Sequence, residues 1–301
     1  MEVDLLRNRL TSVILIMVII TCSFFLPELT APEPEATGNQ QKWPGNQSDT
    51  YIVFLSGLGS YCNGSPYNEM NFSYLRRQFS QVGLTYTDER FLKYSYQGGQ
   101  VNKGRWRPNS YNARDTGQPI EFSILFLKEM IEELSFHHPE ARFLLVGYSL
   151  GGKIAFEYIS QYHLEQPGPI KGVVTLNSPL MGSPYTQTKA LARINPIWGS
   201  VVAKQLAAEY QLKNEQDILY PEKNNVQKLT QSGIRLAAFG TKQDIVVNPL
   251  TARPVDKNGN PLAEGNIISV NPLSGSWNGH KQILENERVT RYILSIYNCP
   301  K

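Results

Sequence analysis

The sequence predicts an α/β fold in which helices cover both faces of a mainly parallel sheet. Short runs of apolar, β-branched and aromatic residues alternate along the chain with longer segments of helical character. This alternation is typical of parallel strands joined by crossover helices. Two of the runs, Tyr51–Leu55 and Phe143–Val146, are apolar throughout, which indicates strands that are buried on both faces.

The composition bounds the size of the protein and excludes several classes of function. The chain has 301 residues, 41% of them hydrophobic, which suffices for one large domain or two small ones. The net charge is +3 and no basic block stands out, so nucleic acid is not an expected partner. The cysteines form no C-x-x-C motif and the histidines have no metal-ligand spacing. We therefore expect no metal site and no cofactor.

Residues 1–26 have the features of a targeting element. Arg7 and Arg9 precede an apolar run from Val13 to Ile20, and acidic residues follow it. This charge asymmetry predicts export, with the protein either secreted or anchored to the extracytoplasmic face of a membrane. A cleaved signal peptide and an uncleaved anchor fit the run equally well, and lipidation at Cys22 is a third alternative.

Residues 27–50 are expected to form a flexible linker, and residues 51–301 the folded domain. The linker is rich in Pro, Glu, Gly, Gln and Asn and has no apolar periodicity. In an exported protein Cys62 and Cys299 could form a disulfide, although the sequence leaves their pairing open.

The elements of the domain follow from local patterns. The first strand, Tyr51–Leu55, ends in the glycine-containing loop Ser56–Ser60. A long helix at Pro119–Phe136 has proline in its first turn, and Asp115 or Thr116 is expected to cap it. The other predicted elements are a helix at 67–81, a strand at 90–96, a polar loop at 98–117, a helix at 153–161, strands at 170–176, 234–240 and 266–270, and a closing helix at 281–297.

The segment at about 183–233 is too long for a simple crossover between two strands. Apolar residues recur in it at helical spacing, interrupted by Pro196 and Gly199. We expect two short helices that form a cap over the carboxyl edge of the sheet, and candidate substrate-contacting residues Trp198, Val201 and Val202. The alternative is that these side chains only pack in the core.

The segment Gly147-Tyr148-Ser149-Leu150-Gly151-Gly152 joins a predicted strand to a predicted helix. In that setting, G-x-S-x-G is typical of a tight turn that holds a serine nucleophile in a strained backbone conformation. Glycine fills the positions at which helix and strand pass too closely for side chains. Ser149 is then expected to project from the carboxyl end of the sheet.

A nucleophilic serine needs a base, and we assign that role to His280. It follows the last predicted strand in a polar, glycine-rich loop, so it lies at the same edge of the sheet as Ser149. The other histidines, His137, His138 and His163, end helices that point away from that edge.

The base in turn needs a carboxylate, for which Asp244 is the candidate. Asp244 comes just after the strand at 234–240, between Ser149 and His280 in the chain. Asp217 lies in the cap segment and Asp256 in a turn. For an oxyanion, the expected donors are the backbone N–H groups of Leu150, at a helix N-terminus, and Leu58, in the first glycine loop.

These residues resemble the α/β-hydrolase superfamily, and within it the secreted bacterial lipases and esterases. The elbow 147–152, the strand and loop 173–183, the acid loop 244–247 and the histidine loop at His280 each resemble a motif of that family. The resemblance covers about Tyr51 to Tyr297. It implies a Ser-His-Asp mechanism, with acyl transfer to Ser149 followed by hydrolysis.

The expected function is hydrolysis of carboxylic esters with an apolar, lipid-like acyl part. The apolar cap residues suggest that acyl part, and the N-terminal segment a membrane tether. An acyltransferase or thioesterase with the same triad is one alternative. A catalytically silent binding domain with this fold is another, although all three triad residues are present here.

Overall fold

The computed structural model describes residues 49–65, 71–184, 189, 192–193, 196–216, 220–256, 258–270 and 279–299. The predicted targeting element and nearly all of the linker lie outside these residues. The chain from Thr50 onward forms one compact unit.

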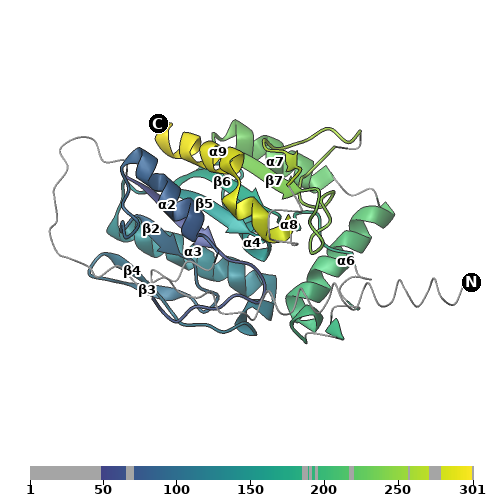
Figure 1. Ribbon diagram of the computed structural model, residues 1–301, viewed down its shortest axis with the longest axis horizontal. Helices are drawn as coiled ribbons and strands as arrows, with labels where there is room; N and C mark the ends of the chain where they lie inside the picture. Colours follow the sequence, from purple (N-terminus) through teal and green to yellow (C-terminus); the bar gives the residue numbers. More distant parts are fainter. Residues whose placement is uncertain are drawn as a thin grey trace, which may run out of the picture. The chain divides into compact units, whose positions relative to one another are not determined.

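A six-stranded parallel sheet forms the centre of this unit, with strand order β2-β1-β5-β6-β7-β8 (Figure 1). The strands are β1 (Thr50–Leu55), β2 (Phe91–Lys93), β5 (Arg142–Tyr148), β6 (Ile170–Leu176), β7 (Arg235–Thr241) and β8 (Ile267–Ile268). The predicted mainly parallel sheet is therefore confirmed. Two strands are shorter than expected: β2 spans 91–93 of the predicted 90–96, and β8 spans 267–268 of the predicted 266–270.

Helices cover both faces of the sheet, as the fold class requires. On one face, α3 (Ile120–His137), α4 (Leu150–Tyr162) and α7 (Tyr220–Gln231) share an apolar core with every second strand residue, such as Leu145. On the other, α2 (Ser73–Gln78) and α9 (Glu287–Asn298) pack on the alternate residues, such as Val146. The strands thus bury both faces, which explains their uninterrupted apolar sequence.

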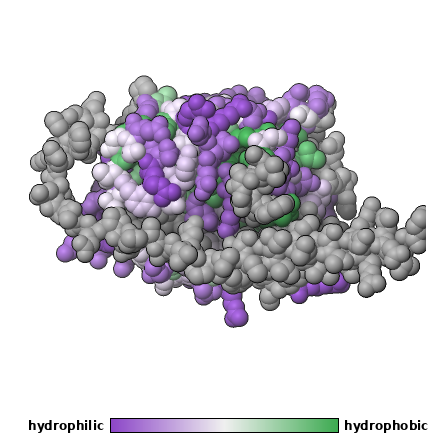
Figure 2. Space-filling view, in the orientation of Figure 1, coloured by the Kyte–Doolittle hydropathy of each residue, from purple (hydrophilic) through white to green (hydrophobic). Residues whose placement is uncertain are grey.

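The closing helix is divided into three pieces rather than continuous. The pieces are α8 (Gly279–Gln282), a 3₁₀ turn η4 (Ile283–Glu285) and α9. The Asn286 side chain caps α9 by accepting from the N–H groups of Arg288 and Val289. Hydrophilic residues cover the outer side of α9 (Figure 2).

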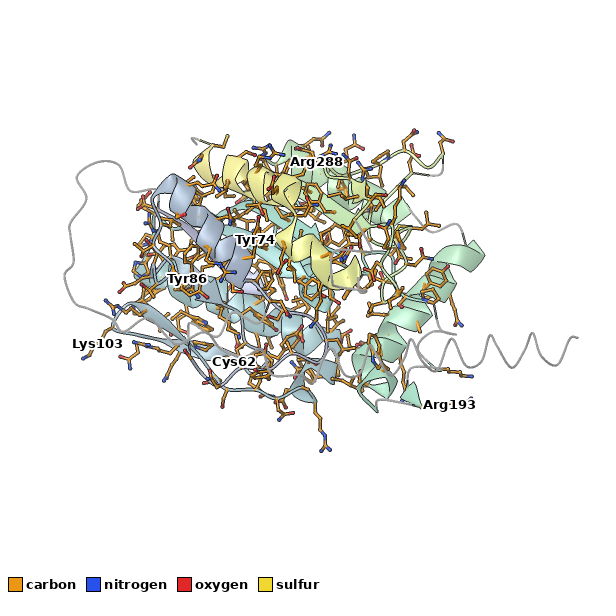
Figure 3. All side chains as sticks on the ribbon, in the orientation of Figure 1. Cys62, Tyr74, Tyr86, Lys103, Arg193 and Arg288 are labelled. Carbon is orange, nitrogen blue, oxygen red and sulfur yellow. The ribbon has the colours of Figure 1, made fainter. Side chains whose placement is uncertain are left out.

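The predicted polar loop 98–117 instead contains a β-hairpin, β3 (Gly99–Asn102) and β4 (Arg105–Pro108). Its two turn residues, Lys103 and Gly104, both have positive φ, which suits a two-residue hairpin turn. Lys103 marks the tip of the hairpin in Figure 3. The hairpin lies outside the main sheet and buries only one side, so its sequence is polar and does not read as a strand.

The expected capping of α3 by Asp115 or Thr116 is wrong. Pro119 occupies the N-cap position without a side-chain hydrogen bond, and Asp115 to Gly117 form a separate 3₁₀ turn, η2. Thr116 is buried and makes contacts elsewhere, described below.

The cap segment also differs from expectation. It contains a 3₁₀ turn, η3 (Pro196–Gly199), and a helix α6 (Val201–Gln216) that is longer than predicted. The second helix, α7, is a crossover helix because Val226 and Leu229 are buried in the core beneath the sheet.

Cys62 and Cys299 are both free thiols, the first buried and the second exposed, so the disulfide considered above is not formed. Every helix among the described residues is too short or too polar to cross a bilayer.

Candidate active site

Ser149 lies on a sharp turn between β5 and α4. Its φ of 55° and ψ of −124° belong to a region that side-chain-bearing residues rarely adopt. A Cβ at Gly147 would collide with the backbone of Gly152, and one at Gly151 would collide with the Leu55 carbonyl. These contacts explain the glycines of the motif, since the helix begins directly over the ends of β5 and β1. The helix starts at Leu150, three residues before the predicted start.

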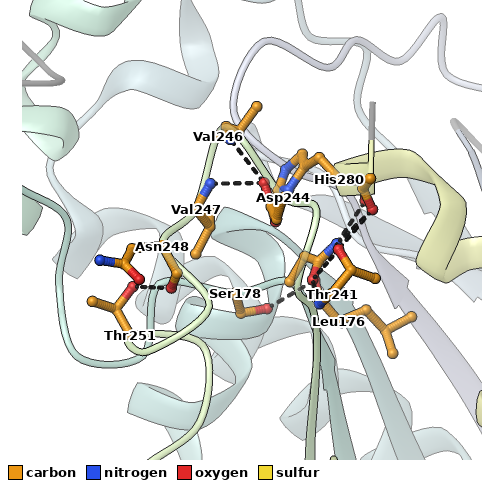
Figure 4. Close-up of polar contacts among 11 residues, drawn as sticks. Leu176, Ser178, Thr241, Asp244, Val246, Val247, Asn248, Thr251 and His280 are labelled. Carbon is orange, nitrogen blue, oxygen red and sulfur yellow. Dashed lines mark hydrogen bonds and ion pairs between the residues drawn. The ribbon is translucent and has the colours of Figure 1, made fainter. Parts of the chain in front are cut away.

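Asp244 and His280, predicted from distant parts of the sequence, form a direct hydrogen bond. His280 Nδ1 lies 2.7 Å from Asp244 Oδ2, and both side chains are only 1% exposed (Figure 4). The other carboxylate oxygen, Oδ1, accepts from the N–H groups of Val246 at 2.8 Å and Val247 at 2.9 Å. Asp244 is therefore fixed by its own loop and can orient the imidazole through Nδ1.

The rejected carboxylates have other positions. Asp256 lies in a turn, where it accepts from the N–H groups of Asn258 and Asn260. Asp217 lies outside the described residues.

Two contacts connect the elbow with the histidine. The ring of Tyr148, which directly precedes Ser149, lies 4.8 Å from the His280 ring, centroid to centroid. In addition, the Ser149 N–H donates to the Leu176 carbonyl at 2.8 Å, and the side chain of the next residue, Asn177, donates to the His280 carbonyl at 2.9 Å. Ser149 and His280 are thus attached to consecutive residues at the end of β6.

The loop after β1 lies against the elbow, as expected for an oxyanion loop. A Cβ at Gly57 would be 2.7 Å from Ser149 Cβ, so only glycine allows this approach. Neither the Leu58 N–H nor the Leu150 N–H makes a hydrogen bond within the described part of the chain. Both groups are therefore available as donors.

Three side chains form hydrogen bonds with this loop. The Tyr96 hydroxyl donates to the Ser56 carbonyl at 2.8 Å, and the Tyr111 hydroxyl lies 3.0 Å from Ser60 Oγ. Thr116 Oγ1 accepts from the Gly59 N–H at 2.8 Å. The loop is thus fixed at both ends and next to Leu58.

The candidate substrate-contacting residues occupy three different environments. Trp198 packs against a small apolar cluster that includes Val246 and Val247, the residues that bind Asp244 through their N–H groups. Val202 is buried in the main core, and Val201 is 48% exposed. Only Trp198 of the three therefore borders the candidate site.

Sequence reasoning missed Tyr148, Asn177 and Tyr96 as site residues. Tyr148 stands at the variable position of the motif, and its hydroxyl has no hydrogen-bond partner in the described part of the chain. Burial raises the pKa of Tyr148 well above its usual value, and the charge of Asp244 adds to that effect. Asn177 lies in the family-like segment 173–183 but was given no role of its own, and its polarity at the end of an apolar strand can indicate a functional edge. Tyr96 gave no signal.

No group of three or more metal-ligating side chains occurs among the residues that the structure describes.

Residues 99–238 match the family described as the alpha/beta hydrolase fold. No curated protein matches the sequence significantly.

Several solved structures resemble the chain at low sequence identity. One comes from a study of carboxylesterases of the thaumarchaeon Nitrososphaera gargenis; it is 17% identical, with 84% of this chain and 93% of that chain covered and a TM-score of 0.45. Naproxen esterase from Bacillus subtilis is 13% identical, with 84% and 85% covered and a TM-score of 0.44. An alpha/beta hydrolase enzyme from a sediment metagenome of the Mar Chica lagoon in Morocco is 16% identical, with 82% and 89% covered and a TM-score of 0.43.

The parallel sheet, the serine on a strained turn at the end of β5 and the family match have one explanation: this chain has the α/β-hydrolase fold.

Proposed function

We propose that the protein is a serine hydrolase that cleaves carboxylic esters through an acyl-enzyme at Ser149. The observation that supports this most strongly is the buried hydrogen bond of 2.7 Å between Asp244 and His280, whose ring packs on Tyr148, the residue before the strained Ser149. A buried carboxylate paired with an imidazole beside a serine is the arrangement that activates a hydroxyl for acyl transfer.

The reaction then has two halves. His280 Nε2 takes the proton of Ser149 Oγ as Oγ attacks the ester carbonyl, and the N–H groups of Leu58 and Leu150 stabilise the oxyanion. The alcohol leaves with the proton from His280, which gives the acyl-enzyme. A water molecule, deprotonated by His280, attacks the acyl carbon and releases the carboxylic acid. Asp244 stabilises the charged imidazole in both halves.

The residues around the site favour an apolar acyl group. Ile197 lies close to Gly59 of the oxyanion loop, 3.8 Å from where a Cβ would be, and Trp198 packs on the acid loop. The turn η3 thus bridges the two loops with apolar side chains. We propose a lipid-like acyl part on this basis.

A fluorophosphonate probe tests the nucleophile, since it reacts only with an activated serine. The wild type should label, and Ser149→Ala should not. Ser232→Ala is the matched control, because the Ser232 hydroxyl donates to Leu229 at the end of α7 and should not affect labelling. The proposal is contradicted if the wild type and Ser149→Ala label equally, or if neither protein labels.

A series of p-nitrophenyl esters of increasing acyl length tests the substrate class. Turnover should extend to emulsified long-chain esters. Activity on short-chain esters alone would reject the lipid-like acyl part, but the protein would still be an ester hydrolase. Product analysis with added alcohols separates hydrolysis from acyl transfer, because a transferase would form a new ester instead of free acid.

We further propose that residues 1–26 direct the protein out of the cytoplasm. The support is the pair Arg7 and Arg9 before an apolar run. Fractionation of cells that express the full chain, compared with a chain that starts at Tyr51, tests this. Identical distribution of both chains would contradict export.

A further inference from the structure

Asn177 is a buried polar residue at the carboxyl end of β6. It directly follows Leu176, the last residue of the strand, and its side chain is fully buried. Its φ is 46°, in the left-handed region that asparagine and glycine tolerate best. Burying an amide costs free energy unless all its polar atoms are bonded, so its contacts have to be accounted for.

The amide of Asn177 bonds to two separate loops. Its Oδ1 accepts from the Thr241 N–H at 2.8 Å, at the end of β7. Its Nδ2 donates to the carbonyls of His280 at 2.9 Å and Gly279 at 3.2 Å. The orientation is fixed chemically, because a backbone N–H can only donate and a carbonyl can only accept. Thr241 strengthens the connection by donating from Oγ1 to the Gly279 carbonyl at 2.8 Å (Figure 4).

The backbone around Asn177 holds the nucleophile and the neighbouring strand. The Leu176 carbonyl accepts from the Ser149 N–H at 2.8 Å, and the Asn177 N–H donates to the Phe239 carbonyl of β7 at 2.8 Å. Two consecutive residues therefore fix the backbone of Ser149, through Leu176, and that of His280, through the Asn177 side chain. A rigid peptide unit joins the two anchors.

His280 needs such an external anchor. It lies in α8, which has four residues, too few for its own hydrogen bonds to hold it firmly. Asp244 fixes the imidazole at Nδ1, and the Asn177 amide holds the backbone of the same residue. Together the two contacts define both the position and the direction of the ring.

We propose that Asn177 is a positioning residue that sets the place of His280 relative to Ser149. The inference rests on the proposed function, because it concerns the step in which His280 takes the proton from Ser149. Removing the amide leaves the nucleophile, the acid and the oxyanion donors in place and lets the imidazole move away from Oγ.

Two substitutions test this role without forcing the backbone. Asn177→Gly keeps the left-handed φ and removes the amide. Asn177→Asp keeps the shape and the acceptor for Thr241 but removes the donor to the two carbonyls. Both should lower kcat for ester hydrolysis about 10- to 100-fold, as expected for a displaced catalytic group, with KM within about twofold.

Val173→Ala is the matched control for a general loss of stability. Val173 is fully buried in the same strand, and its side chain belongs to the apolar core on the face covered by α3 and α4. This variant should unfold at a lower temperature but keep its kcat when assayed well below the transition.

The decisive experiment measures fluorophosphonate labelling rates in two backgrounds. Asn177→Gly should slow labelling in the wild type but cause no further loss in His280→Ala, because a residue that acts through the imidazole has nothing left to position. The same fold-loss in both backgrounds would overturn the inference. So would an unchanged kcat, or failure of both Asn177 variants to fold, which would assign the residue to folding.

The outcome for the proposed function is read separately. A His280→Ala variant that labels at the wild-type rate would overturn the serine hydrolase assignment itself, and the role of Asn177 with it. If His280→Ala labels slowly and the losses in labelling rate from the two substitutions multiply, only the role of Asn177 is overturned.

Discussion

The ring of Tyr148 lies 4.8 Å from the ring of His280 and forms one wall of the space in which the imidazole sits. The residue at the variable position of the elbow motif therefore contacts the base. Because the Tyr148 hydroxyl is buried and has no hydrogen-bond partner in the described part of the chain, the ring accounts for its role there.

We expect Tyr148→Phe to keep fluorophosphonate labelling within about twofold of the wild type. It should leave the free energy of unfolding unchanged or raise it by about 1 kcal/mol, because an unpaired buried hydroxyl is removed. Tyr148→Ala should lower it by about 3–5 kcal/mol and slow labelling. Urea unfolding and labelling rates test both. A tenfold loss of labelling in Tyr148→Phe would show that the hydroxyl takes part in the reaction.

Asp244→Asn should lower kcat about 10³- to 10⁴-fold, because the amide cannot stabilise the charged imidazole and favours the wrong tautomer. Ester hydrolysis under saturating substrate tests this. Asp256→Asn is the control, since the Asp256 carboxylate accepts from the N–H groups of Asn258 and Asn260 in a turn, and its kcat should match the wild type. Equal losses in the two variants would remove Asp244 from the site.

Thr116→Val should lower kcat about tenfold with little change in KM. The variant keeps the shape of the side chain but loses the acceptor for the Gly59 N–H, a bond worth about 1 kcal/mol. The loop that carries Leu58 is then less fixed. A phosphonate transition-state analogue should lose affinity in parallel with kcat. A change in KM alone would place Thr116 in substrate binding instead.

Lys153→Met should destabilise the domain by about 1–3 kcal/mol, because it removes a buried cation that is hydrogen-bonded to two partly exposed carboxylates. Lys153 Nζ is bonded to Glu157 in its own helix at 2.7 Å and to Glu209 of α6 at 2.5 Å. Urea unfolding measures the loss. Lys128→Met is the control, because the exposed pair of Lys128 with Glu132 has the same spacing and should matter little. Equal effects would mean that the buried pair adds nothing.

The free energy of unfolding should be steady up to about pH 10 and fall above it. Burial raises the pKa of Tyr94 above its usual value. For Lys153, burial lowers the pKa, but the carboxylates of Glu157 and Glu209 outweigh the effect of burial, so the pKa is raised. A group whose pKa is raised in the folded state stabilises that state fully below its unfolded pKa. The contribution is lost as the pH rises toward the folded pKa.

Urea unfolding between pH 8 and pH 11 measures this decline. Each such group adds up to about 1.4 kcal/mol per pH unit, so Tyr94→Phe should decline less steeply than the wild type. Parallel curves for the two proteins would mean that Tyr94 ionises alike in both states.

The sequence predicted the sheet and the proximity of Asp244 and His280 because both depend on local signals. Apolar runs identify strands that are buried on both faces, and the ends of parallel strands share one edge. Ser149, Asp244 and His280 each follow such a run, so all three are expected at one edge of the sheet. The hairpin at 99–108 could not be predicted from the sequence, because it buries one side only and its strands are polar.

The contacts that hold the site loops in place could not be predicted from local sequence patterns. Tyr96 and Ser56 are far apart in the chain, and nothing near either position indicates that they bond. Asn177 depends on three loops that meet only in the folded protein. The capping of α3 failed for a similar reason, since Thr116 is engaged by Gly59 rather than by the helix that follows it.

The backbone conformation of Ser149 lowers the stability of the folded state. Holding a residue with a side chain at φ 55° and ψ −124° costs about 1–3 kcal/mol that glycine would not incur. Selection for heat resistance alone would therefore replace this serine with glycine. Under the proposed function, the nucleophilic hydroxyl is the reason why this position holds serine.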